Sequence, residues 1–115
     1  MSTEKHYDAA VVQPKPTSKS DDIDVAVVAA ARLKELGLNE VAEDIEARIR
    51  LGERKYGSRL KAFNGRSALL DLLQESLDAI NYAQQCQIEG LDDGTLFSRA
   101  VELTVLIKNK MDSTG

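Results

Sequence analysis

The fold is decided by residues 67–82, which read SALLDLLQESLDAINY. Ser67 is a favoured residue for the N-cap of a helix. Behind it, leucine and isoleucine recur at positions 69, 70, 73, 77 and 80, which is the spacing of one helical face. The pattern predicts a helix from Ser67 to about Glu89 that buries one apolar stripe.

Three further segments have the periodicity of helices. Residues 23–36 are rich in alanine and valine and end at Gly37, a typical helix terminator. Their β-branched residues also allow a strand, but the alanine run and the length favour a helix. Asn39 is a favoured N-cap for a helix to about Tyr56, and either Asp92 or Asp93 is the cap of a fourth. Four helices joined by short loops predict an all-α fold, a four-helix antiparallel bundle.

The ends of the chain differ in composition. Residues 1–21 hold both prolines and no repeating apolar face, so they predict a flexible tail, which can order against a partner. Residues 22–115 are expected to form a single helical bundle domain. The first predicted helix is apolar on nearly all sides, which is hard to cover inside one small bundle. We therefore expect a homo-oligomer, either a dimer or a dimer of dimers.

Composition excludes several classes of protein. The chain has 115 residues without tryptophan, so its core must be aliphatic. One cysteine, Cys86, and one histidine, His6, exclude an internal disulfide and a structural zinc site built from these residues alone. No signal peptide and no apolar run of about 20 residues is present. We expect a cytoplasmic protein with no membrane partner.

Charge is unevenly distributed along a chain whose net charge is −4. Residues 48–66 carry seven basic side chains against Glu53 alone, and the segments on either side are acidic. So short a cationic region suits a compact anionic ligand, such as a nucleotide or a metal-bound phosphate, better than a long nucleic acid. An ordinary solvated helix end is the alternative.

Acidic residues are grouped on two of the predicted helices. Asp71, Glu75 and Asp78 fall within a narrow wedge of the third helix, and Glu43 and Glu46 share a face of the second. Converging carboxylates are tolerated mainly around a hard cation, and Mg²⁺ prefers such oxygen ligands. The same residues also lie opposite the apolar stripes, where solvated acids belong. Both interpretations stay open on spacing alone.

The stretch 48–82, with its Lys-Tyr-Gly at residues 55–57 and Asn-Gly-Arg at 64–66, resembles small phage-encoded MazG-like proteins. These belong to the all-α nucleoside triphosphate pyrophosphatase superfamily. The family pattern is Glu-x-x-Glu on one helix and Glu-x-x-Asp on a later one, which residues 43–46 and 75–78 match. A second register, from Glu40 to Glu43, matches the first motif equally well.

The resemblance implies a function and a set of site residues. The function is magnesium-dependent attack of water on a nucleoside triphosphate, which releases a monophosphate and pyrophosphate, in the host cytoplasm if the chain is phage-encoded. The implied Mg²⁺ ligands are Glu43, Glu46, Glu75 and Asp78, with Glu46 and Glu75 as the catalytic acids. The cationic region of residues 48–66, which we call the basic loop, adds the expected phosphate-binding residues. They are Lys55, Arg59, Lys61 and Arg66.

Two other functions stay open. Ser67 and Gln74 stand where acids are common in proteins of this type, and a reduced set of acids weakens a metal site before it weakens the fold. Such a protein would bind and sequester a nucleotide or a cyclic nucleotide signal without cleaving it. The third hypothesis is a helical protein-interaction module, whose partner would dock on the apolar first helix.

Overall fold

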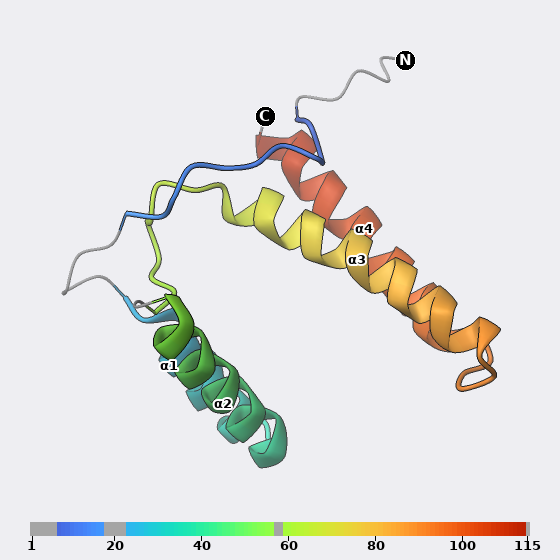
Figure 1. Cartoon of the computed structure of the whole chain (residues 1–115), viewed down its shortest axis with the longest axis horizontal. Helices are drawn as coiled ribbons and strands as arrows, with labels where there is room; N and C mark the ends of the chain where they lie inside the picture. The colour runs from blue at the N-terminus through green and yellow to red at the C-terminus, as the bar shows by residue number, and fades with distance from the viewer. Residues whose placement is uncertain (1–6, 18–22, 57–58, 115) are drawn as a thin grey trace. The chain divides into compact units, whose positions relative to one another are not determined.

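The computed structural model describes residues 7–17, 23–56 and 59–114, and the regular secondary structure among them is helical (Figure 1). The helices are α1 (Val25–Glu35), α2 (Asn39–Tyr56), α3 (Ala68–Ile88) and α4 (Thr95–Thr114). These described residues contain no strand, only an isolated antiparallel bridge between Asp24 and Lys61. The predicted all-α fold with four helices is confirmed, and the strand alternative for residues 23–36 is wrong.

The chain divides into two compact units. Unit 1 comprises Met1–Pro14 and Arg66–Gly115 and contains α3 and α4, whereas unit 2 comprises Lys15–Gly65 and contains α1 and α2. Within each unit the two helices pack against each other. The antiparallel arrangement of all four helices and the single domain over residues 22–115 stay predictions.

Local capping interactions set the ends of α1 and α3. The Ser67 hydroxyl accepts a hydrogen bond from the Leu70 N–H (3.1 Å), and Asp24 Oδ1 accepts one from the Val27 N–H (3.3 Å). Gly37 follows α1 with a φ of +78°, a left-handed conformation that favours glycine. These contacts satisfy backbone groups that a helix end leaves without a partner, so the predicted cap at Ser67 and terminator at Gly37 are confirmed.

The other two helices begin slightly differently from the prediction. The Ala42 N–H donates to the carbonyl oxygen of Leu38 (3.1 Å), so Asn39 is the first helical residue of α2 and not its cap. Asp92 Oδ2 accepts from the Leu96 N–H (3.1 Å) at the start of α4. The boundaries of the helices therefore follow the sequence to within about two residues, as helix ends usually do.

The core of unit 1 lies between α3 and α4. Leu70, Leu73 and Ile107 form its buried cluster, and the Leu73 side chain is 1% exposed. Beside this cluster, the buried Thr104 hydroxyl donates to the buried Ser76 hydroxyl (3.0 Å), so the two helices share a polar contact as well. Aliphatic packing of this kind is what the tryptophan-free composition predicts.

Unit 2 has a much smaller buried core. Among its described residues, the buried apolar ones are Ala26, Ala30 and Ala42, while Val27 and Val28 of α1 are 57% and 56% exposed. The α1–α2 pair is therefore held by close contact of small side chains and leaves larger apolar groups uncovered.

Residues 7–14, which we call the N-terminal segment, belong to unit 1 although the sequence places them in a flexible tail. Tyr7 and Ala9 pack against the Leu70–Leu73–Ile107 cluster. Gln74 Nε2 of α3 donates to the carbonyl oxygen of Val11 (2.7 Å). The rest of the predicted tail includes residues 1–6 and 18–21, which lie outside the described residues. The segment contains no helix, as expected, but it is attached to α3.

None of the helices described here is long and apolar enough to cross a membrane.

Candidate functional site

Two exposed carboxylates on α3 are the clearest candidates for chemistry. Glu75 and Asp78 lie one helical turn apart, a spacing that puts their Cβ atoms about 5–6 Å from each other. Among the described residues, neither carboxylate has an ion-pair or hydrogen-bond partner. Both side chains are therefore free to bind a ligand from solvent.

The third acid of the predicted wedge, Asp71, is in a different situation. Its Oδ1 lies 2.7 Å from Nη2 of Arg66, and its Oδ2 accepts from Arg66 Nε (3.1 Å). These hydrogen bonds lower the pKa of Asp71, an effect that partial burial opposes, and they raise the pKa of Arg66. Asp71 is thus a charged structural residue, and only two acids of the wedge stay available.

The predicted acids of α2 lie in unit 2, whereas the α3 pair lies in unit 1. Glu43 is exposed and has no partner among the described residues. Glu46 is engaged, because its Oε1 accepts from Lys34 Nζ of α1 at 3.1 Å. Glu40 is also exposed. The structure therefore leaves both registers of the Glu-x-x-Glu motif open.

The predicted phosphate-binding residues of the basic loop form internal ion pairs. Arg59 Nε lies 2.8 Å from Asp24 Oδ2 and 3.8 Å from Glu53 Oε2, and Lys61 Nζ lies 3.9 Å from Asp24 Oδ2. The buried Arg59 Nε has no aligned hydrogen-bond acceptor, so its contact with Asp24 is an ion pair only. The Lys55 side chain lies outside the described residues. With Arg66 held by Asp71, three of the four predicted cations already have acidic partners.

A second group of cations, on α2, was counted in the cationic region of the sequence but was not included among the predicted phosphate-binding residues. Arg48, Arg50 and Arg54 are exposed and have no acidic partner in the described part of the chain. Arg50 and Arg54 are one turn apart and share a helical face with Glu43. Their spacing of four residues, opposite the apolar stripe of α2, was the signal that could have found them.

The donor set can be compared with what Mg²⁺ requires. Among the described residues, no group of three or more His, Cys, Asp or Glu side chains is gathered closely enough to hold a metal ion. Mg²⁺ in proteins is usually held by one or two carboxylates, with waters and substrate phosphates as its other ligands. The α3 pair fits a cation that arrives with a nucleotide, and it does not fit a cage built from protein ligands alone.

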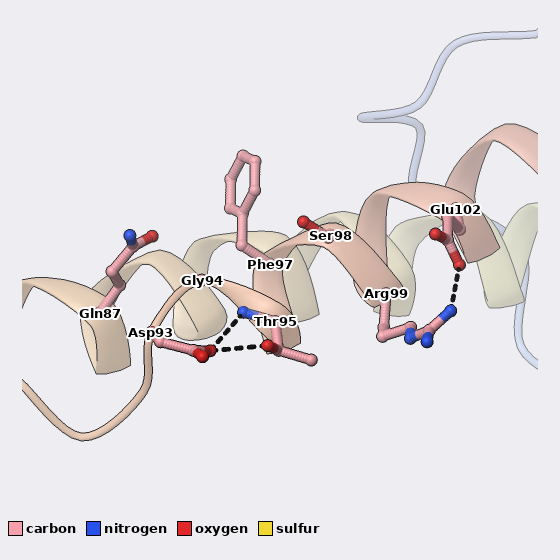
Figure 2. Close-up of a pocket in the computed structure, with 8 residues that line it drawn as sticks. All are labelled: Gln87, Asp93, Gly94, Thr95, Phe97, Ser98, Arg99 and Glu102. Atoms are coloured by element: carbon pink, nitrogen blue, oxygen red, sulfur yellow. Dashed lines mark hydrogen bonds and ion pairs between the residues drawn. The ribbon is translucent and has the colours of Figure 1, made fainter.

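A polar groove of about 540 Å³ lies at the turn between α3 and α4 (Figure 2). Asp93 Oδ1 accepts from the Thr95 hydroxyl (2.6 Å) and N–H (3.1 Å), which lowers the pKa of Asp93. Arg99 Nη1 donates to Glu102 Oε2 (3.1 Å). These side chains satisfy one another, and none of the predicted site residues lines the groove. The groove is therefore not the candidate site.

A second, apolar groove of about 580 Å³ runs along α1 in unit 2. It is lined by Ile23, Val25, Val28, Ala29, Arg32, Leu33 and Leu36. Its single charged residue makes it a candidate surface for contact with another apolar helix, and not a site of catalysis.

Comparisons with protein-family models, curated proteins and solved structures found no match to the chain.

Proposed function

We propose that the protein is a magnesium-dependent nucleotide pyrophosphohydrolase, which cleaves a nucleoside triphosphate to a monophosphate and pyrophosphate. The observation that carries the proposal is the state of the α3 acids. Asp71 forms an ion pair with Arg66, while Glu75 and Asp78 have no counter-charge among the described residues. Like charges one helical turn apart repel each other, and a divalent cation removes this repulsion.

The proposed roles follow from which acids are available. Bound with a nucleotide, Mg²⁺ would neutralise phosphate charge and increase the acidity of a water molecule. Glu75 and Asp78 would hold the cation, and Glu75 would also be placed to accept a proton from a water molecule. Glu43, the acid of α2 that has no partner among the described residues, is exposed in unit 2. The proposed catalytic role of Glu46 requires its ion pair with Lys34 to open first.

Phosphate binding is assigned to the unpaired cations. Arg50 and Arg54 can approach an anion without giving up an existing ion pair, whereas Arg59 and Lys61 would have to leave Asp24. Guanidinium groups also match the geometry of phosphate oxygens through paired hydrogen bonds. Arg50 and Arg54 are therefore the cations of α2 that are most readily available to an anion.

The test is an assay of pyrophosphate release from a panel of ribo- and deoxyribonucleoside triphosphates, with and without Mg²⁺. Glu75→Gln and Asp78→Asn should each lower kcat/KM by about 10²-fold or more, the scale of a lost acid–base group or ligand. Asp112→Asn is the matched control, because Asp112 is an exposed acid of α4 that has no partner in the part of the chain that the structure describes. Unchanged turnover in both α3 variants would refute the proposal.

The second candidate function is binding a nucleotide or a cyclic nucleotide without cleaving it. It is favoured by the unpaired arginines of α2, which need no metal to bind an anion. The same nucleotide panel, titrated by calorimetry, separates the two functions. A sequestering protein would bind without turnover and without Mg²⁺, and Arg50→Ala would weaken binding whereas Glu75→Gln would not.

We further propose that the protein acts as a homo-oligomer in a reducing cytoplasmic compartment. The exposed apolar groove of α1 supports self-association, because a second copy of the same helix has the apolar side chains that this groove needs. The single cysteine, Cys86, is a free thiol, which agrees with a reducing compartment.

A further inference from the structure

The N-cap of α3 depends on a residue far away in the sequence. In a capping box, the third residue of the helix is Glu or Gln, and its side chain accepts a hydrogen bond from the N–H of the N-cap residue. The N-cap here is Ser67, and the third helical residue is Leu70, which has no acceptor. Gln13 of the N-terminal segment takes this role, because its Oε1 accepts from the Ser67 N–H at 2.6 Å.

The same end of the segment holds the first turn of α3 through further hydrogen bonds. Gln13 Nε2 donates to the Ser67 carbonyl oxygen (3.1 Å) and to Asp71 Oδ1 (2.8 Å). Arg66 Nη1 donates to the carbonyl oxygen of Pro14 (2.8 Å). The Arg66–Asp71 pair is therefore flanked on both sides by groups of the N-terminal segment.

The other end of the segment is held about two helical turns further along α3. Gln74 Nε2 donates to the carbonyl oxygens of Ala9 (3.0 Å) and Val11 (2.7 Å). Tyr7 and Ala9 add apolar contacts with the buried cluster of unit 1. Hydrogen bonds at both ends, together with the apolar contacts of Tyr7 and Ala9, thus attach the segment to α3 and to the core between α3 and α4.

We propose that the N-terminal segment docks on α3 as one cooperative unit, and that docking completes the N-cap of α3 and keeps Arg66 on Asp71. The segment has no helix or strand of its own to hold its shape. Each contact must therefore overcome the entropy of ordering the same short stretch of chain, so the contacts support one another. Release at Gln74 consequently loosens the cap at Ser67. The proposal does not depend on the enzymatic function.

The test uses NMR to measure the rate of amide hydrogen exchange at Ser67 in the full chain carrying Gln74→Ala. Gln74 does not touch Ser67, so any effect at that amide reports coupling through the segment. Loss of two hydrogen bonds should speed exchange of the Ser67 N–H by about tenfold. Gln85→Ala is the matched control, because the Gln85 side chain is on the same helix and, among the described residues, hydrogen-bonds to exposed Glu89 alone.

A reciprocal variant makes the test independent of any one substitution. Gln13→Ala should remove the protection of the Gln74 side-chain amide protons, although Gln13 makes no hydrogen bond to Gln74. Ser67 exchange that is unchanged in Gln74→Ala, or equally accelerated in Gln85→Ala, would overturn the proposal. The first result would mean that the contacts form and break separately. The second would mean that the exchange rate reports only the global stability of unit 1.

Discussion

Asp71, Glu75 and Asp78 follow one another along α3, and yet their surroundings differ. Arg66 lies just before the helix, where the chain turns its guanidinium back onto Asp71. Glu75 and Asp78 have no basic residue within one turn on either side. The spacing of Arg66 and Asp71 is not a helical spacing, so the periodicity that grouped the three acids could not separate the structural acid from the free ones.

The lowered pKa of Asp71 has a consequence for stability that depends on pH. A carboxyl whose folded pKa is depressed stabilises the fold above its unfolded pKa, and this contribution disappears as pH falls through the folded pKa. Asp71→Asn should therefore lower Tm at pH 7, and the difference from the parent should shrink as the solution is acidified. Thermal denaturation followed by circular dichroism over a pH series measures this. A difference that is constant with pH would show that charge is not its source.

The limits of the helices were largely predictable from sequence, because the signals that set them are local. Ser67 and Gly37 act on backbone groups within a few residues. The hydrogen bond from the Ser67 N–H to Gln13, which completes the α3 cap, was not predictable, since Gln13 is 54 residues from Ser67 in the chain. The sequence around a glutamine in a proline-containing segment does not indicate which residue its side chain will bind.

At the level of paired elements, α1 and α2 are joined by small side chains. Ala42 of α2 is 0% exposed, and Ala26 and Ala30 lie one turn apart on α1. Interaxial distance depends on the side chains at the contact, so alanines let two helices approach closely. Any larger side chain at these positions would have to separate the helices.

Ala42→Leu tests this packing. Overfilling a close contact should destabilise unit 2 by about 1–3 kcal/mol, measured as a lower midpoint in urea denaturation followed by circular dichroism. Ala47→Leu on the exposed side of the same helix is the control and should change stability by no more than about 0.5 kcal/mol. If both variants were equally stable, the alanine contact would not be closely packed.

At the scale of the whole molecule, hydrophobic periodicity predicted the all-α class but not the division into two units. Periodicity indicates which face of a helix is buried, but it does not indicate which other helix packs against that face. The candidate acids show the same limit: their motifs were readable from sequence, but α2 and α3 belong to different units. The internal pairing of Arg59 and Lys61 with Asp24 was equally invisible, because it depends on the loop returning to the start of α1.

Self-association is tested on the intact chain by multi-angle light scattering at micromolar concentration. We expect a mass of at least two copies, and Val28→Glu in the apolar groove of α1 should shift it toward one copy, because a charge would be buried there. Ala31→Glu is the control, since Ala31 is exposed on α1 outside the groove. A parent protein that runs as a stable monomer would contradict the proposal.

Leu73, which is 1% exposed, is the most completely buried large side chain among the described residues, and few other large side chains are buried there. The apolar area newly hydrated when a single chain unfolds is correspondingly small, and both the heat-capacity increment and the denaturant m-value scale with that area. We therefore expect a shallow stability curve and melting that is spread over a wide interval of temperature.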